Sequence, residues 1–161
     1  LCDLFFASEY RYAAFRVPAE IAEDLVADIF VKAWEKVGTY RVQKGVPFGA
    51  WLFRIARHMV IDAYRAHKLT EEVSDDMLDP DTLNRAETRV VRKHLLATVR
   101  GAMDRLPKRY QEVLHLSYIA ELPNDEVART LKIRAGAART LKSRALKKLE
   151  EVLPPDIREN L

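Results

Sequence analysis

Apolar residues recur every three or four positions along most of this chain, the spacing that gathers them on one face of an α-helix. Residues 3–17 form the first such segment, whose expected core residues are Leu4, Phe5, Ala7, Tyr12 and Phe15. Residues 20–37 form the second, with Leu25, Val26, Ile29, Phe30, Ala33, Trp34 and Val37 directed inward. Pro18 separates the two helices, and Gly38 is a suitable stop for the second.

A longer amphipathic helix is predicted over residues 47–68. Its apolar arc contains Trp51, Leu52, Ile55, Ala56, Met59, Val60 and Ala63, with Phe53 and Tyr64 at the edge. The opposite face carries Arg54, Arg57, His58, Asp62, Arg65 and Lys68. Taken alone, the segment is typical of a core helix with a solvated basic face. The first part of the chain is therefore predicted to be a bundle of three or four helices.

The second half of the chain begins with two further helical segments. Residues 86–106 place Val90, Val91, Leu95, Val99, Ala102 and Met103 at helical spacing. Pro107 starts the next helix, whose candidates for burial are Tyr110, Val113, Leu114, Leu116 and Tyr118. A short helix with Val127, Ala128 and Leu131 inward, a turn at residues 132–134 and a longer helix with the stripe Leu141, Ala145 and Leu149 then predict a helix-turn-helix.

Charge divides the chain into three parts. Residues 1–68 have a net charge of +2, residues 69–84 carry six acidic residues and no basic one, and residues 85–161 have a net charge of +7. The acidic stretch has few apolar residues and is predicted to be a flexible linker. The predicted fold class is therefore all-α, with two small helical domains, a helical bundle at 1–68 and a helix-turn-helix domain at 85–161, joined by the acidic linker at 69–84.

Composition and motifs exclude several classes of function. The chain has no apolar run long enough for a membrane span, and its single Cys2 has no internal disulfide partner. No metal-ligand cluster, phosphate-binding glycine loop or nucleophile elbow is visible, so we expect no cofactor, no metal and no enzymatic activity. A reducing cytoplasm is the expected location. The chain begins without a methionine, which we interpret as a trimmed N-terminus.

The last long helix is the clearest chemical signal. Residues 134–148 contain six basic residues and no acidic one, whereas a solvated helix face usually mixes both signs. The pattern favours a helix that faces an anion such as the phosphate backbone of a nucleic acid.

Three motifs together carry a family resemblance. AEDLVADIFVKAW and FGAWLFRIARHMVIDAYR in the first domain, and LPKRYQEVLHLSYIAELPNDEVARTLKI in the second, resemble bacterial RNA polymerase sigma factors of the extracytoplasmic-function (ECF) type, in the sigma-70 family. This resemblance implies a transcription initiation factor that joins core RNA polymerase, recognises promoter DNA near minus 35 and minus 10, and opens the duplex. It also implies that an anti-sigma factor is a possible partner.

The resemblance assigns tasks to particular residues. Those implied to contact core polymerase are Asp24, Asp28, Lys32 and Glu35. Those implied to contact minus 10 DNA are Arg54, Arg57, His58, Asp62 and Arg65. Those implied to contact minus 35 DNA are Arg134, Arg139, Lys142, Ser143, Arg144 and Lys147. Ala137 departs from the family pattern by lacking a hydroxyl that could cap the helix, which leaves the details of the minus 35 contacts open.

Two alternatives remain at this point. A helix-turn-helix regulator that acts without polymerase would explain the second domain, but it leaves the first without a task. The acidic linker has two interpretations of equal weight: its charge could imitate a nucleic-acid strand in a basic path of the polymerase, or it could keep a connector soluble and extended.

Overall fold

The computed structural model describes residues 2–41, 45–70 and 86–159, and every regular element in those ranges is helical. The first domain consists of α1 (Cys2–Ala14), α2 (Ala19–Lys36), a short 3₁₀ turn η1 (Val37–Thr39) and α3 (Phe48–Thr70). The second consists of α4 (Ala86–Asp104), α5 (Lys108–Leu114), a π-helical turn η4 (His115–Ile119), α6 (Asn124–Leu131), α7 (Ala135–Val152) and α8 (Pro155–Arg158). The all-α prediction is confirmed. The linker assigned to residues 69–84 lies almost wholly outside the described residues.

Prolines set the starts of four helices. Pro18, Pro107, Pro123 and Pro154 occupy the position immediately before α2, α5, α6 and α8, each with an extended backbone. A proline there ends the preceding segment and loses nothing, because the first amides of a helix have no partner within it. These prolines explain why the predicted helix boundaries fall within a few residues of the observed ones.

The helix-turn-helix prediction is also confirmed in its position. Helix α6 ends at Leu131, Lys132 adopts a left-handed conformation (φ 57°), and α7 begins at Ala135. The amide of Ile133 donates to the carbonyl of Ala128 (2.9 Å), and the side-chain amide of Asn124 donates to the carbonyl of Ala135 (3.1 Å). These bonds fix the angle between α6 and α7.

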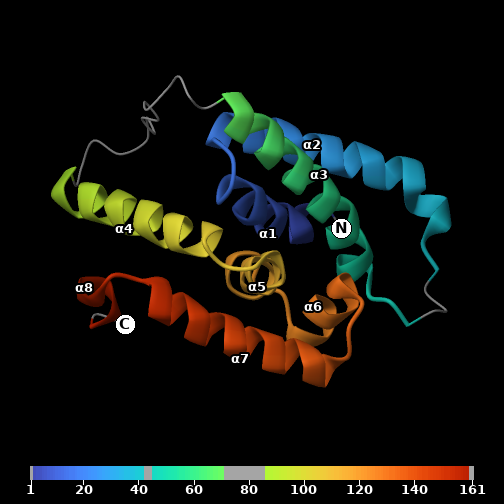
Figure 1. Ribbon diagram of the computed structural model, residues 1–161. Coiled ribbons are helices and arrows are strands. Elements are labelled where there is room, and N and C mark those ends of the chain that lie inside the picture. Colours follow the sequence, from blue (N-terminus) through green and yellow to red (C-terminus); the bar gives the residue numbers. More distant parts are fainter. Residues whose placement is uncertain (1, 42–44, 71–85, 160–161) are drawn as a thin grey trace.

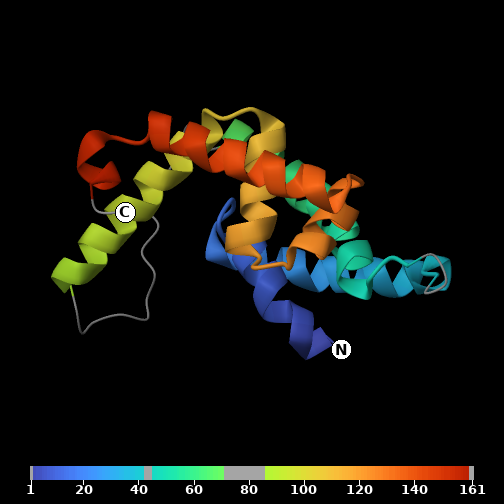
Figure 2. The ribbon, with the colours of Figure 1, turned by 90° about the horizontal axis from the view of Figure 1, so that it is seen from below.

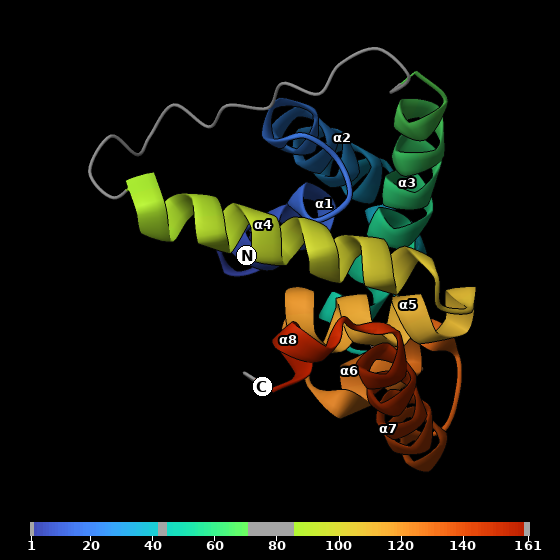
Figure 3. The ribbon, with the colours of Figure 1, turned by 60° about the vertical axis from the view of Figure 1, so that its left-hand side comes forward.

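The two domains pack directly against each other. Helix α3 lies between α2 of its own domain and α6 of the second, and η4 contacts α1. Figure 1 shows α2 along one side of the molecule and α7 along the other, and Figure 3 shows the same order from another direction. Figure 2 shows α7 on the side away from the N-terminal end of α1. Helices α2 and α7 thus form opposite outer surfaces.

One apolar cluster joins the domains, where the sequence predicted a core for each. Tyr12, Ile29 and Phe53 from the first domain belong to the same buried cluster as Val113 and Leu116 from the second. Phe53, which was placed at the edge of the apolar arc, is fully buried. The apolar face of α3 is therefore wider than its own three-helix bundle requires.

Several residues predicted to be buried are exposed instead. They are Leu4, Ala7, Trp34, Val37, Val90, Val91, Leu95 and Tyr118. Periodicity identifies the apolar face of a helix, but it does not say whether another helix reaches that face along its whole length. The N-terminal half of α4 illustrates this limit, because it extends away from α5 and α7 (Figure 3).

Candidate functional site

Helix α2 presents a charged outer face. Ala22, Val26, Ile29 and Ala33 are buried against the bundle. The four residues predicted to contact a protein partner all lie on the exposed side, and they are Asp24, Asp28, Lys32 and Glu35. The Nζ of Lys32 lies 3.4 Å from Oε2 of Glu35, a surface pair that leaves both groups half exposed and accessible to a partner.

Exposed apolar side chains accompany these charges. Trp34 is 79% exposed, and Val31 and Val37 are also exposed on the same part of α2 and η1. The prediction that Trp34 and Val37 are core residues is wrong, because the bundle covers only the side of α2 that carries Val26 and Ile29. A large exposed aromatic within a charged surface is typical of a protein-binding site, where Trp often supplies much of the binding energy. Trp34 is thus a candidate contact that the sequence analysis missed.

The five basic and polar residues predicted on α3 separate into two groups. His58, Asp62 and Arg65 are exposed to solvent. Arg54 and Arg57 are only partly exposed, because they face the second domain. Helical spacing places Arg54 and Arg57 one turn apart on the same side, and α6 and α5 cover that side.

Both arginines are engaged by acceptors from the second domain. Arg54 donates from Nε (3.0 Å) and from Nη2 to the carbonyl of Arg129 in the last turn of α6. Arg57 donates from Nε to Oε2 of Glu112 on α5 (3.0 Å). Burial, together with the neighbouring charge of Arg129, lowers the pKa of Arg54 from its ordinary value. The family resemblance implied that these two residues contact nucleic acid, and nothing in the sequence indicated their partners in the second domain.

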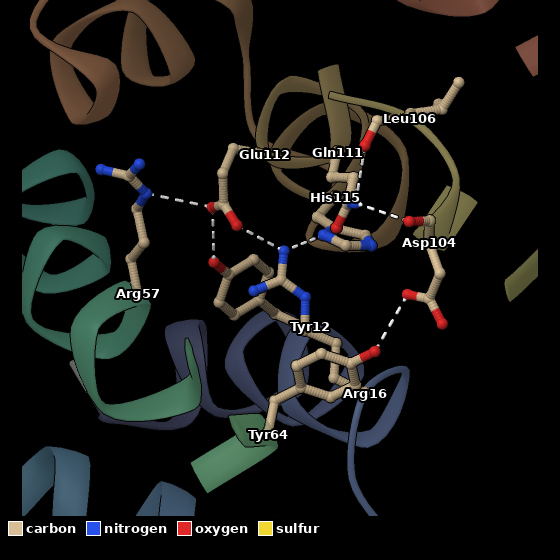
Figure 4. Close-up of polar contacts among 9 residues, drawn as sticks. All are labelled: Tyr12, Arg16, Arg57, Tyr64, Asp104, Leu106, Gln111, Glu112 and His115. Carbon is tan, nitrogen blue, oxygen red and sulfur yellow. Dashed lines mark hydrogen bonds and ion pairs between the residues drawn. The ribbon is translucent and has the colours of Figure 1, made fainter. Parts of the chain in front are cut away.

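A buried polar cluster surrounds Glu112 (Figure 4). In addition to the hydrogen bond from Arg57, the Glu112 carboxylate accepts one from the Tyr12 hydroxyl (3.1 Å). It also forms an ion pair with Nη2 of Arg16 (2.6 Å). Nη2 of Arg16 also lies against Nδ1 of His115, and because a guanidinium group can only donate, the ring nitrogen is the acceptor. The side chains of Arg16 and Glu112 are each only 7% exposed, so this ion pair is almost completely removed from water.

Charges are paired at the buried centre of this cluster, where Arg16 faces Glu112. Burial acts to lower the pKa of Arg16, but Tyr12 and Glu112 outweigh it and raise the pKa above its ordinary value. Burial, reinforced by Glu112, raises the pKa of Tyr12 so that its hydroxyl remains a donor. Charged and polar groups buried in this way require these partners, because an unpaired charge would lose its hydration without compensation.

Weaker contacts surround this buried centre. Arg11 donates to the carbonyl of Ile119 and forms an ion pair with Glu121, both at 3.2 Å. On another side, the Tyr64 hydroxyl donates to Oδ1 of Asp104 (3.1 Å). The domain boundary therefore has a buried ionic centre and an exposed polar rim. No single motif indicated it, since each contact joins positions far apart in the chain.

The basic helix α7 presents most of its predicted residues to solvent. Arg134, Arg139, Ser143, Arg144 and Lys147 are exposed, and Lys142 is half-buried with its Nζ 5.8 Å from the centre of the Tyr118 ring. The predicted inward stripe is confirmed, because Ala145 is buried and Leu141 and Leu149 pack against the core. Helix α7 can therefore approach a nucleic acid with its basic side while its apolar side stays on α5.

The described part of the chain has neither a candidate metal site nor a helix suited to a membrane. No group of three or more His, Cys, Asp and Glu side chains within residues 2–41, 45–70 and 86–159 could hold a metal ion. In the same ranges, none of the helices has both the length and the apolar character that a membrane crossing requires.

Comparison with known proteins gives two family matches. Residues 9–70 match the family described as Sigma-70 region 2, and residues 96–149 match Sigma-70, region 4. The chain is 35% identical to the ECF RNA polymerase sigma factor BldN of Streptomyces coelicolor over 98% of its own length, and it spans 61% of that protein. It is 30% identical to the ECF RNA polymerase sigma factor SigM of Bacillus subtilis over 81% of this chain and 78% of SigM.

Two solved structures have a similar fold. CnrH, solved in complex with the cytosolic domain of CnrY, matches with a TM-score of 0.64 at 26% identity, covering 91% of this chain and 80% of CnrH. The sigma factor RpoE of Bartonella quintana, solved with the anti-sigma factor NepR, matches with a TM-score of 0.61 at 22% identity, covering 92% of this chain and 91% of RpoE. At 22% identity, the match to RpoE shows a shared fold only.

Proposed function

Because the chain belongs to the extracytoplasmic-function (ECF) family of RNA polymerase sigma factors, we propose that it joins core RNA polymerase, directs it to promoters and opens the minus 10 region. The observation that carries this proposal is the presence of both region 2 and region 4 in one short chain. In this role the chain recognises DNA, and RNA synthesis is the chemistry of the polymerase. We accordingly place its action in the cytoplasm.

We assign polymerase docking to the outer face of α2. Asp24, Asp28, Lys32 and Glu35 provide charges of both signs, and the neighbouring Trp34 provides an exposed apolar anchor. Charged groups at the edge of a contact steer association, whereas an aromatic side chain supplies binding energy when it is covered. The combination suits a partner surface that is partly apolar and carries charges of both signs.

DNA contacts are assigned to α3 and α7. On α3, Arg54, Arg57, His58, Asp62 and Arg65 would hold the minus 10 strand after it leaves the duplex. Strand opening costs stacking and pairing energy, which a basic surface that binds the separated strand recovers. On α7 and at its N-cap, Arg134, the residues that would enter the major groove at minus 35 are Arg134, Arg139, Lys142, Ser143, Arg144 and Lys147.

The domain assignment follows from these tasks. Residues 1–68 would carry docking and minus 10 opening, and residues 85–161 would carry minus 35 recognition. The acids of residues 71–81 lie outside the described residues, so both interpretations of the linker stay hypotheses. CnrH was solved with the cytosolic domain of CnrY, and we include a protein inhibitor of that kind, an anti-sigma factor, among the expected partners.

Run-off transcription tests the proposal. Core polymerase supplemented with this chain is incubated with a genomic promoter library, and the transcripts are sequenced. We expect new start sites that share two upstream elements and that are absent without the chain. An independent helix-turn-helix regulator would instead shift promoter DNA in an electrophoretic assay without polymerase and would leave the set of start sites unchanged.

A further inference from the structure

The turn between α6 and α7 contains a residue that its backbone conformation does not favour. Lys132 follows the last residue of α6 with φ 57° and ψ 43°, in the left-handed region. Its amide donates to the carbonyl of Arg129 (3.3 Å), and the next amide, that of Ile133, donates to the carbonyl of Ala128 (2.9 Å). These two bonds close a Schellman motif, whose left-handed position is usually glycine because a side chain there crowds the backbone. A lysine at this position therefore costs stability that a glycine would retain.

No ion pair within the described part of the chain offsets this strain. In the described ranges one other non-glycine residue, Glu121, has a positive φ (57°), and its carboxylate forms an ion pair with Arg11 (3.2 Å). Lys132 differs, because its side chain is exposed and none of the described carboxylates pairs with its ammonium group. A strained residue of this kind is a reason to look for a functional contact outside the chain.

The charged residues next to Lys132 in the sequence are all basic. Residues 127–149 contain eight basic residues and no acidic one. Arg129 lies three positions before Lys132 and Arg134 two positions after it, and all three side chains are exposed. Positive charges gathered in this way repel one another, and an anion placed beside them removes that repulsion. The turn therefore carries an excess of positive charge that a phosphate group would neutralise.

We propose that Lys132 contacts a phosphate of the DNA backbone when α7 lies in the major groove, and that this contact compensates for the strain of a lysine at this position. The inference deepens the proposed function, from which it takes the approach of α7 to duplex DNA. In helix-turn-helix proteins the first helix crosses the DNA backbone while the second enters the groove, so the turn between them lies close to phosphates. A lysine ammonium binds phosphate as a compact charge and needs no fixed orientation.

The first turn of α7 offers no other side chain for this task. It consists of Ala135, Gly136 and Ala137, and the helix begins without a side-chain cap. The positive charge at this end of α7 comes from Lys132 and Arg134, since the next basic residue is Arg139. A phosphate contact positions a protein on DNA without reading its sequence, so a loss of this contact should weaken binding to all sequences alike.

Three variants of the full-length chain separate the strain from the contact. Lys132→Gly removes both the strain and the charge, Lys132→Asn removes the charge but tolerates the left-handed conformation, and Lys132→Arg keeps the charge. The matched control is Lys36→Asn, which makes the same charge change at an exposed position at the end of α2, on the opposite outer surface (Figure 1). A mixed-sequence DNA duplex with a fluorescent label is the probe, and its anisotropy measures binding.

We expect Lys132→Gly to change stability and DNA binding in opposite directions. Its melting temperature should rise by roughly 2–4 °C, because glycine adopts the left-handed conformation without strain. Its affinity for the duplex should fall, and fall most at low salt, because binding releases fewer counterions. One lost phosphate contact reduces the slope of log affinity against log salt by about 0.9, so the deficit in affinity should shrink about 3.5-fold between about 50 and 200 mM salt.

The other variants decide whether the charge is the cause. Lys132→Asn should lose the same part of the salt slope, Lys132→Arg should keep it, and Lys36→Asn should bind as the starting protein does. A variant that is more stable and yet binds less tightly cannot owe its weaker binding to misfolding.

Three results would overturn the proposal. The first is an unchanged salt slope in Lys132→Gly and Lys132→Asn. The second is an equal loss of slope in Lys36→Asn, which would indicate a general effect of net charge. The third is the absence of duplex binding by the starting protein at about 50 mM salt, where phosphate contacts are strongest.

The contact and the proposed function fail in different ways. Run-off transcription that depends on the chain, together with unchanged salt slopes in the Lys132 variants, would leave the sigma-factor function standing and remove the phosphate contact. Reduced slopes in Lys132→Gly and Lys132→Asn, together with no transcription by the starting protein and core polymerase, would leave the contact standing and remove the function.

Discussion

Glu9 on α1 gives the sharpest prediction about stability. Its side chain is completely buried, and neither carboxylate oxygen has a hydrogen-bond partner among the described residues. Burial alone raises the pKa of Glu9 from 4.5 to about 8. The carboxyl group is therefore mostly protonated in the folded protein at neutral pH, whereas in the unfolded chain it is ionised. We predict that replacing it with the neutral Glu9→Gln removes a pH-dependent loss of stability.

The direction and size follow from proton linkage. Between pH 4.5 and about 8 the folded state binds the proton that the unfolded state has released, so the free energy of unfolding falls as pH rises through this window. The pKa difference corresponds to a loss of roughly 4–5 kcal/mol once both states are ionised. Small domains have a total stability of about 5–15 kcal/mol, so this one group is expected to affect folding strongly at alkaline pH.

Urea unfolding followed by circular dichroism at pH 5, 7 and 9 measures the effect. Glu9→Gln should differ little from the starting protein in pH dependence below pH 5 and should gain on it by roughly 4 kcal/mol between pH 5 and pH 9. The exposed Glu23→Gln on α2 is the control and should stay within about 0.5 kcal/mol of the starting protein throughout. A constant difference between the two proteins at pH 5 and pH 9 would refute the reasoning, because it would mean that Glu9 ionises normally.

The remaining predictions concern the proposed partners. Asp28→Lys should weaken binding to core polymerase without changing helical content, and an unchanged affinity at moderate salt would count against this face of α2. Trp34→Ala should also weaken core binding while leaving the melting temperature nearly unchanged, since the side chain is exposed; a large drop in melting temperature would contradict the structure. Arg139→Ala and Arg144→Ala should differ, because a base-reading arginine costs roughly 1–3 kcal/mol at one promoter position and a phosphate contact lowers the salt slope by about one for every sequence. Filter binding to a set of single-base promoter variants separates the two outcomes. Arg57→Ala should spare closed-complex formation and reduce permanganate reactivity of unpaired thymines; failure of a pre-melted bubble template to rescue transcription would argue against an opening role.

Local physical rules account for the part of the structure that was predictable. Helix boundaries follow from prolines such as Pro107 and Pro123 and from the period of apolar residues, both of which act over a few positions. The break between α6 and α7 and the inward positions of Leu141 and Ala145 were visible for the same reason. The basic side of α7 was predictable because the charges of its residues follow from the sequence without knowledge of any tertiary contact.

Contacts between distant segments decided the rest. Glu112 meets Arg57, 55 positions away, and Arg16, 96 positions away, and nothing local to any of the three residues indicates that they would pair. Likewise, Trp34 shares the helical spacing of a core residue, but it is exposed, and none of the helices in the described ranges covers it. The sequence by itself determined the helices, their order and the families of region 2 and region 4. Only the tertiary structure decided which polar and apolar faces meet, because burial and pairing depend on which surfaces from the two domains come together in space.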